Sequence, residues 1–308
     1  MRAGVTGGLG ALGSSKEFVL RTSIPIRKLA RLAAGLAASV LVVTGTNSVQ
    51  AGEPGASTCA FTGGEVTVDL QEDDSSGILS RDAAGLIFYD DESEPPTPPA
   101  PCGLATTATT TRIKVKDTSN DGSTGIILDL TEGPFANGGT EIPIRIDLDR
   151  GVIDTFGLVG GGGVDFWTFG FKKANLQNDQ NAELTFVTFP DFGFGAAGGD
   201  NDHACATGNR GTGGPSQIGW VFAGGAGNDV LCGGRDTDRL VGQAGNDKIR
   251  GSGGGDTLKG GAGADRISGN SSSDVLAGNR GGDILNGGVG FDGCNGGPGG
   301  DRKRRCET

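Results

Sequence analysis

Residues 224–304 read as nine consecutive nonads: GGAGNDVLC, GGRDTDRLV, GQAGNDKIR, GSGGGDTLK, GGAGADRIS, GNSSSDVLA, GNRGGDILN, GGVGFDGCN and GGPGGDRKR. Position 6 of every nonad is an aspartate: Asp229, Asp238, Asp247, Asp256, Asp265, Asp274, Asp283, Asp292 and Asp301. Position 8 is aliphatic in the first seven nonads: Leu231, Leu240, Ile249, Leu258, Ile267, Leu276 and Leu285. One inward side chain per loop cannot be buried alone, so neighbouring repeats must stack. The period therefore predicts a solenoid.

The rest of each nonad indicates the ligand. Positions 1, 2 and 4 are rich in glycine, which reaches positive φ without steric cost and lets a loop turn its carbonyl oxygens inward. The aspartate adds a hard, charged oxygen, and calcium takes roughly six to eight oxygen ligands. The pattern predicts calcium held by aspartates and loop carbonyls. A glycine-rich disordered linker, the alternative, has no reason to keep both residue types in phase.

This pattern resembles the RTX, or haemolysin-type, calcium-binding repeat G-G-x-G-x-D-x-U-x. The resemblance implies an all-β fold over residues 224–304, a right-handed parallel β-roll in which two nonads make one turn. It also implies that calcium lies between loops stacked on the same edge. Without calcium, repulsion between stacked carboxylates favours a disordered roll.

Two nonads per turn divide the loops between two edges. The first edge takes the odd nonads, whose position 4 is always glycine: Gly227, Gly245, Gly263, Gly281 and Gly299. The second edge takes the even nonads, where Asp236 and Ser272 replace two of the four glycines. We call the space between two stacked loops a gap. We expect about four good calcium sites in first-edge gaps and up to three weaker ones on the second edge, since aspartate tolerates the left-handed backbone better than most residues.

The charge balance limits the classes of partner. The chain has 26 Lys and Arg against 37 Asp and Glu, a net charge of −11, which argues against nucleic acid and anionic membranes. The one basic run, residues 302–305, is interpreted as a solvated cap, because position 8 changes to Cys294 and then Lys303 and ends the aliphatic ladder. Residues 305–308 form a short tail.

The first 51 residues are interpreted as a leader and signal peptide. Arg21, Arg27, Lys28 and Arg31 precede an apolar run at 32–43, which is too short to span a bilayer comfortably, and a small-residue cleavage site ends near Ala51. The long segment before the run suggests a downstream start. We therefore expect a secreted protein. Removing residues 1–51 takes away six basic residues and one acid, and leaves 20 Lys and Arg against 36 Asp and Glu.

All six cysteines follow the leader, which suggests three disulfides in an exported chain. Six cysteines allow fifteen pairings. Proximity in sequence favours Cys59–Cys102, Cys205–Cys232 and Cys294–Cys306.

Residues 52–196 are expected to be a β-rich region of different character. Strand-like runs occupy 65–70, 85–89, 111–116, 125–130 and 142–148, and an acidic, proline-rich loop at 90–101 is expected to be extended. Nonad echoes place Asp165 and Asp202 at position 6 and make them candidate extra calcium ligands. Residues 197–223 are interpreted as a degenerate transition. We favour a solenoid-like region that merges into the roll over an independent sandwich.

Catalytic signals are weak. His203 is the single histidine, which excludes a site that needs two, and no G-x-S-x-G elbow is present. Four aromatic residues, Phe166, Trp167, Phe169 and Trp220, are expected to cap or fill a thin core and not to line a sugar cleft. We predict a non-enzymatic calcium-binding protein. Two alternatives stay open: a polysaccharide-active enzyme with acids in the N-terminal β region, and an adhesion or matrix module that binds a cell-surface polysaccharide.

Overall fold

The computed structural model describes residues 57–71, 76–91, 99–118, 124–137, 140–148, 155–170, 173–176, 184–186, 192–208 and 214–307. All of them belong to one compact unit, residues 49–308. The predicted leader at 1–51 lies outside the described residues, as does most of the predicted loop at 90–101. In the described part of the chain, no helix is long and apolar enough to cross a membrane.

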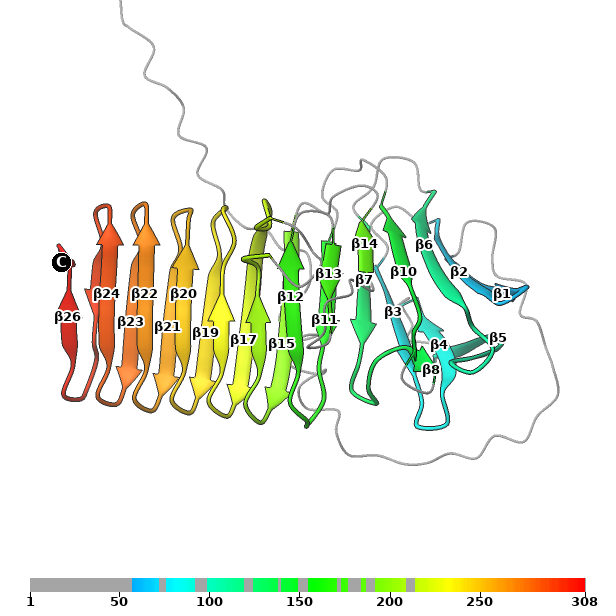
Figure 1. Cartoon of the computed structure of the whole chain (residues 1–308), viewed down its shortest axis with the longest axis horizontal. Helices are drawn as coiled ribbons and strands as arrows, with labels where there is room; N and C mark the ends of the chain where they lie inside the picture. The colour runs from blue at the N-terminus through cyan, green and yellow to red at the C-terminus, as the bar shows by residue number, and fades with distance from the viewer. Residues whose placement is uncertain are drawn as a thin grey trace, which may run out of the picture. The chain divides into compact units, whose positions relative to one another are not determined.

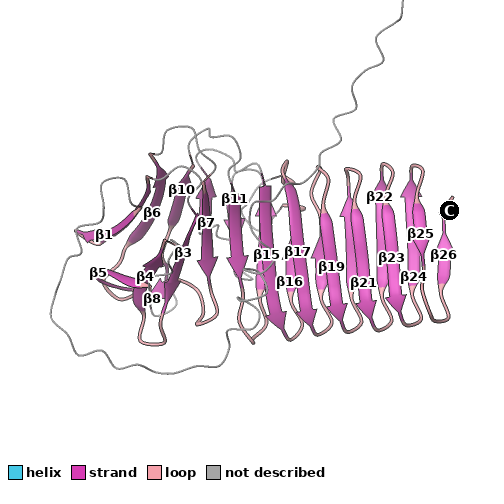
Figure 2. Cartoon of the chain, turned by 180° about the vertical axis from the view of Figure 1, so that it is seen from behind, coloured by secondary structure: helices cyan, strands magenta, loops and turns pink. Residues whose placement is uncertain are grey.

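The described residues form an all-β fold of two large sheets (Figures 1 and 2). Sheet A has the order β1 (Thr58–Thr62), β2 (Glu65–Leu70), β6 (Arg112–Asp117), β10 (Ile144–Asp147), β14 (Leu184–Phe186), β13 (Lys173–Asn175), β12 (Phe166–Gly170), β16 (His203–Cys205), β18 (Val230–Cys232), β20 (Lys248–Ser252), β22 (Arg266–Ser271), β24 (Ile284–Val289) and β26 (Arg302–Arg304). Sheet B has the order β25 (Gly293–Asn295), β23 (Val275–Arg280), β21 (Thr257–Ala262), β19 (Arg239–Ala244), β17 (Gly219–Ala226), β15 (Phe192–Gly199), β11 (Thr155–Val159), β7 (Gly125–Asp129), β3 (Ser76–Arg81), β4 (Leu86–Asp90) and β5 (Ala100–Thr106). A small hairpin joins β8 (Ala136–Asn137) to β9 (Thr140–Glu141).

The C-terminal strands pair in parallel with a fixed offset of 18 residues. Leu231 aligns with Ile249 in sheet A, and Leu240 aligns with Leu258 in sheet B. Successive nonads therefore alternate between the two sheets, and two nonads make one turn, as the resemblance implied. All seven predicted position-8 residues are at most 2 % exposed, so the aliphatic ladder forms the core of the roll.

The N-terminal region shares both sheets with the roll. In sheet A, β12 pairs with β16, and β16 pairs with β18 of the roll. In sheet B, β11 pairs with β15, and β15 pairs with β17 of the roll. The N-terminal region therefore merges into the roll, as expected, but it is only partly solenoid-like, because β1–β2, β3–β4–β5 and β12–β13–β14 pair antiparallel. The five predicted strands correspond to β2, β4, β6, β7 and β10.

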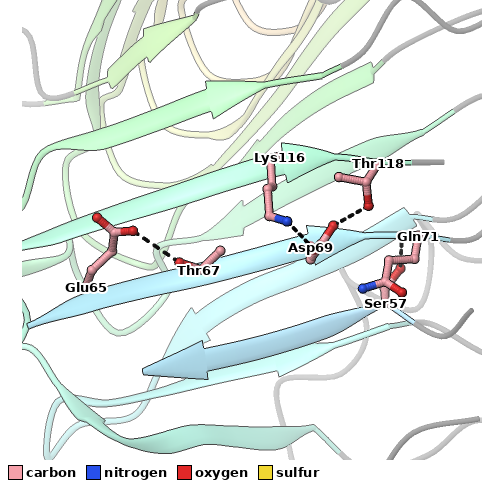
Figure 3. Close-up of polar contacts among 7 residues, drawn as sticks. All are labelled: Ser57, Glu65, Thr67, Asp69, Gln71, Lys116 and Thr118. Carbon is pink, nitrogen blue, oxygen red and sulfur yellow. Dashed lines mark hydrogen bonds and ion pairs between the residues drawn. The ribbon is translucent and has the colours of Figure 1, made fainter. Parts of the chain in front are cut away.

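Polar contacts on the outer face hold the first strands of sheet A together (Figure 3). Asp69 on β2 pairs with Lys116 on β6, and the hydroxyl of Thr118 donates to Asp69 Oδ1 at 2.5 Å. The alternate residues of β2 and β6 point inward, and Val66, Val68, Ile113 and Val115 are at most 1 % exposed. These strands show the alternation expected of a half-buried sheet.

Aromatic residues fill the core where the N-terminal region meets the roll. Trp167, Phe169, Trp220 and Phe222 are each 1 % exposed, and the ring centroids of Phe169 and Trp220 lie 4.1 Å apart. The expectation of a filled thin core is confirmed for Trp167, Phe169 and Trp220. Phe166 differs, because it is half-buried and its ring stacks on His203.

The three disulfides are those that sequence proximity favoured: Cys59–Cys102, Cys205–Cys232 and Cys294–Cys306. The second joins neighbouring strands β16 and β18 of sheet A. The third ties the tail to β25, the last strand of sheet B.

Removing one residue of the ladder should destabilise the roll. Leu258 on β21 is fully buried, so Leu258→Ala should lower the free energy of unfolding by about 2–5 kcal/mol. Its neighbour Lys259 is half-buried and its side chain lies on the other face of the strand. Lys259→Ala should therefore change the free energy of unfolding by less than about 0.5 kcal/mol. Urea unfolding at a fixed calcium concentration measures both. Equal effects of the two variants would contradict the assignment of the core face.

Candidate calcium centre

The predicted aspartates form two lines, one along each edge of the roll. First-edge loops connect sheet B to sheet A, and second-edge loops connect sheet A to sheet B. The position-6 side chains from Asp229 to Asp292 are at most 2 % exposed, while Asp301 in the last complete nonad is half-buried. Burial of a carboxylate is costly unless it is paired, so each oxygen needs a partner.

One carboxylate oxygen of each aspartate accepts a hydrogen bond from the preceding turn. On the first edge, the Asp229 amide donates to Asp247 Oδ1 at 2.9 Å, and the same bond repeats at Asp265, Asp283 and Asp301 over 2.9–3.0 Å. On the second edge, the amides of Asp238, Asp256 and Asp274 donate to Asp256, Asp274 and Asp292 in turn, over 2.8–2.9 Å. These bonds hold every carboxylate in the same orientation.

The other oxygen, Oδ2, is buried and has no hydrogen-bond partner at nine aspartates: Asp165, Asp202, Asp229, Asp247, Asp256, Asp265, Asp274, Asp283 and Asp292. At all of them except Asp202, whose nonad begins at Ala197, it lies over the position-1 glycine of its own nonad. A β-carbon on Gly224 would lie 2.1 Å from Asp229 Oδ2 and 2.9 Å from the carbonyl oxygen of Gly242, in the next first-edge loop. Two acceptors therefore converge with no donor between them, an arrangement that a cation stabilises.

Position 1 is glycine in all nine nonads, and the structure gives the reason. The hypothetical β-carbon of every one of these glycines would lie 2.1–2.5 Å from Oδ2 of the aspartate five residues later. Sequence reasoning treated positions 1, 2 and 4 as equal sources of flexibility. The strict glycine at position 1 was the available signal that this position leaves room for the carboxylate.

Glycine at position 4 of the first edge has a different cause. Gly227, Gly245, Gly263, Gly281 and Gly299 have φ between 133° and 158°, in the left-handed region. A β-carbon on Gly281 would lie 1.6 Å from the carbonyl oxygen of Gly263, in the preceding first-edge loop. Only glycine allows the loops to approach this closely.

Asp165 and Asp202 join the first edge. The Asp202 amide donates to Asp229 Oδ1, and the Asp165 amide donates to Asp202 Oδ1, both at 2.8 Å. A β-carbon on Gly160 would lie 1.9 Å from Asp165 Oδ2 and 2.5 Å from the Ala197 carbonyl oxygen, which repeats the arrangement at Gly224. An asparagine ladder also extends into this loop, since the Asn228 amide donates to Asn201 Oδ1 at 2.6 Å.

The second edge begins at Asp238, where the arrangement changes. The amide of Trp220, 18 residues earlier, donates to Asp238 Oδ1 at 2.7 Å, so an aromatic residue stands where the preceding aspartate would be. The Gly234 amide donates to Asp238 Oδ2 at 2.8 Å, and this oxygen is therefore satisfied within its own loop. Asp236 is not among the described residues with positive φ, so the loop has not taken the backbone of its neighbours.

Ser272 behaves differently from Asp236. Its φ is 80°, so the loop keeps the left-handed backbone at a non-glycine residue. The next loop approaches both residues closely, since a β-carbon on Gly290 would lie 2.1 Å from the Ser272 carbonyl oxygen and one on Gly254 would lie 2.3 Å from that of Asp236, so the difference between them is in the backbone. The two replacements that looked equivalent in sequence are thus distinct: one loop keeps the repeat geometry and the other leaves it.

Burial raises the pKa of eight of these carboxyl groups. It raises the pKa of Asp165 and Asp256 to about 7, of Asp202 and Asp247 to about 6, and of Asp238 to about 8. The pKa values of Asp229, Asp265 and Asp274 are raised for the same reason. Hydrogen bonds from backbone amides oppose this effect, and at most of these sites neighbouring aspartate charges add to it.

The donor set fits calcium better than a transition metal. Among the described residues, no three or more His, Cys, Asp or Glu side chains come together in a group that could hold a metal ion. Any ion in a gap would therefore take most of its ligands from loop carbonyls, with carboxylates from the two bordering loops. Hard oxygen ligands in a flexible loop suit calcium.

Comparison with known proteins agrees with this chemistry. The family model described as the RTX calcium-binding nonapeptide repeat (4 copies) matches residues 221–240, 233–267, 241–276, 259–294 and 268–302. Residues 221–302 are an RTX repeat segment. Comparison with curated proteins found no match, and neither did comparison with solved structures. The matched segment starts after Asp165 and Asp202, which join the RTX line of aspartates only in the structure.

His203 borders the RTX segment without joining a cluster of titratable groups. It lies on β16, its amide donates to the Asp165 carbonyl oxygen at 2.8 Å, and its ring stacks on Phe166 with 4.2 Å between centroids. His203 therefore follows directly after the first-edge loop that carries Asp202.

Two adjacent glycines allow a matched test of the close approach at position 4. Gly281→Ala should lower the free energy of unfolding by about 1–3 kcal/mol or more, because alanine at φ 142° is strained and its β-carbon would meet the Gly263 carbonyl. Gly282→Ala should be nearly neutral, since the nearest atom to its β-carbon is 3.8 Å away. Urea unfolding at one calcium concentration compares them. A Gly282→Ala variant as unstable as Gly281→Ala would argue against this packing.

The metal-free protein should become less stable as the pH rises. The folded-state pKa values, about 6 to 8, lie above the ordinary 3.8, so the folded form binds more protons than the unfolded chain between pH 4 and 8. Its free energy of unfolding therefore falls across this range. Far-UV circular dichroism in a chelator should detect more strand at pH 4.5 than at pH 8. A strand signal that increases with pH would contradict the assigned burial.

Proposed function

We propose that this chain is a secreted calcium-binding protein whose nine nonads fold into a β-roll when calcium binds. The observation that carries the proposal is the unpartnered Oδ2 of nine aspartates, which at seven of them lies close to a loop carbonyl oxygen from the next turn. Two acceptors in a buried gap, with no donor, need a cation. The RTX repeats at 221–302 support calcium as that cation.

The unpartnered oxygens indicate which gaps would bind. On the first edge they belong to Asp229, Asp247, Asp265 and Asp283, which accounts for the four expected sites, and to Asp165 and Asp202, which add two more. On the second edge, Asp256 and Asp274 border the two gaps between complete loops that keep the repeat geometry. Asp238 lacks an unpartnered oxygen, and we propose that the first second-edge gap binds calcium weakly or not at all.

The residues of each gap would act together. The aspartates at the two bordering loops and the carbonyls of the intervening glycines would provide the oxygen ligands, while the amide bond to Oδ1 orients each carboxylate. Bound calcium would supply positive charge that offsets the cost of burying the carboxylates. Because no such cage exists in the unfolded chain, the free energy of binding becomes free energy of folding.

Export gives this coupling its setting. Calcium is scarce in the cytoplasm, and extracellular calcium modules bind at about 10⁻⁴–10⁻³ M. Three disulfides favour an oxidising compartment. We propose that the chain stays loose before export and folds outside the cell, and that it acts through calcium and not through catalysis.

A substitution inside the first edge should weaken calcium-driven folding. Asp265→Asn removes charge from a carboxylate whose Oδ2 is unpartnered, so the calcium concentration at the folding midpoint should rise about tenfold, equivalent to about 1.4 kcal/mol. Calcium titration followed by far-UV circular dichroism provides the midpoint. The matched control is Asp236→Asn, which removes the same charge from an exposed residue of a loop that lacks an unpartnered oxygen.

The control midpoint should shift by less than about twofold, because Asp236 is proposed to hold no ion. If the strand signal of the wild type did not respond to calcium at all, calcium-driven folding would be disproved. If both variants shifted equally, general charge and not a defined site would control the response.

A further inference from the structure

The chain continues beyond its last complete nonad, and the extra residues fall in register with the repeats. Arg305 lies nine residues after Gly296 and so occupies position 1 of a tenth, incomplete nonad. Strand β26 ends at Arg304, and Cys306 is bonded to Cys294 on β25. The disulfide holds the tail against the last second-edge loop, residues 287–292.

The tail repeats the hydrogen bonds of a complete loop. At the preceding position, the Asp274 amide donates to Asp292 Oδ1 at 2.9 Å. At the end of the edge, the Asp292 amide donates to Glu307 Oε2 at 2.6 Å. The Glu307 amide in turn donates to the Asp292 carbonyl oxygen at 2.9 Å, as the Gly293 amide does to Asp274. Glu307 therefore places its carboxylate where the aspartate of a complete tenth nonad would place its own.

The gap beneath the tail also has the pair of acceptors. A β-carbon on Gly287 would lie 2.1 Å from the Arg305 carbonyl oxygen and 2.5 Å from Asp292 Oδ2. Asp292 is fully buried, and its Oδ2 has no hydrogen-bond partner. This is an unpartnered, buried carboxylate oxygen aimed at a carbonyl, independent of the presence of Glu307.

The use of glutamate fits the place of residue 307 within the nonad. Glu307 occupies position 3 of the incomplete nonad and not position 6, so its carboxylate reaches the edge from a different point on the backbone. Arg305 has φ 50°, a left-handed conformation that turns the chain at the start of the tail. A longer acidic side chain on a turned backbone reproduces the carboxylate position that a complete loop reaches with aspartate.

We propose that residues 305–307 complete an additional calcium site at the end of the second edge. Asp292 and Glu307 provide its carboxylates, and the Arg305 carbonyl provides the oxygen that position-1 glycine supplies elsewhere. The Cys294–Cys306 disulfide keeps this half-loop in place, so the tail is both a cap and a ligand. The proposal rests on the proposed calcium-binding function, because it extends the same chemistry to residues outside the repeat motif.

Native mass spectrometry of the full chain, with its disulfides oxidised, tests the site by counting calcium ions. Glu307→Gln keeps an oxygen acceptor for the Asp292 amide and removes the negative charge. At the lowest free calcium concentration that saturates the wild type, this variant should bind one ion fewer. The matched control is Glu141→Gln, an equal change of charge on the β8–β9 hairpin, which should bind as many ions as the wild type.

Far-UV circular dichroism at the same calcium concentration checks that the variant has kept its strands. Loss of one ion with the strand signal retained supports the site. An unchanged count overturns the proposal and leaves the calcium-binding function intact. Loss of several ions also overturns it, because Glu307 would then act only as a cap that prevents fraying. A wild type that binds no calcium would instead disprove the proposed function itself.

Discussion

The structure depends on one unsatisfied contact, repeated along two edges: a buried carboxylate oxygen that faces a carbonyl oxygen across a gap. The other carboxylate oxygen is fixed by an amide from the preceding turn, so the side chain cannot rotate away from the gap. Water cannot take the place of a cation without space and several partners. The folded chain therefore bears a desolvation cost for each buried carboxylate, and a bound cation or a proton offsets that cost.

This contact explains the composition of the repeat more fully than flexibility does. In the nine nonads at 224–304, position 1 is glycine, which leaves room for Oδ2, and first-edge position 4 is glycine because the preceding loop lies against it. The loop of Asp202 departs from both, with Ala197 at position 1 and Asp200 at position 4. Position 8 is free to be any aliphatic residue that fits the core. The loop thus carries the geometric requirement and the strand carries the packing requirement, which is why the roll tolerates varied residues at its other positions.

Much of the fold could be predicted from sequence because its signals are local or periodic. The nine-residue repeat and the strands near 65–70 and 125–130 follow from such signals, and sequence proximity favoured the three disulfides among fifteen pairings. The 18-residue turn was implied by the resemblance to the RTX repeat. Strand β15 could not be found this way. Its sequence is FGFGAAGG, and Gly193 is required because the Trp220 ring lies where a β-carbon would be, 2.3 Å away. That contact joins residues 27 apart and leaves no periodic trace.

The position of Asp202 in the candidate site also could not be predicted from the sequence period. Counting nine-residue steps back from Gly224 would put Asp202 on the second edge, yet its hydrogen bonds place it on the first. Asp202 lies 27 residues before its hydrogen-bond partner Asp229, instead of the 18 residues of the regular repeat, so counting nine-residue steps fails here. Trp220 lies 18 residues before Asp238, as the repeat requires, but it has no carboxylate. The line of aspartates on the second edge therefore begins one turn later, at Asp238.

The shared use of each aspartate has an electrostatic consequence. A line of stacked loops has one carboxylate per gap, and a calcium ion carries twice the charge of one carboxylate. Filling a gap would therefore leave a surplus positive charge there instead of neutrality. The first edge, with more gaps that meet the requirement, would gain more of it than the second. A chain that is strongly anionic while unfolded would then present a cationic face along one side of the loaded roll, and calcium would change the sign of the field that an approaching molecule meets.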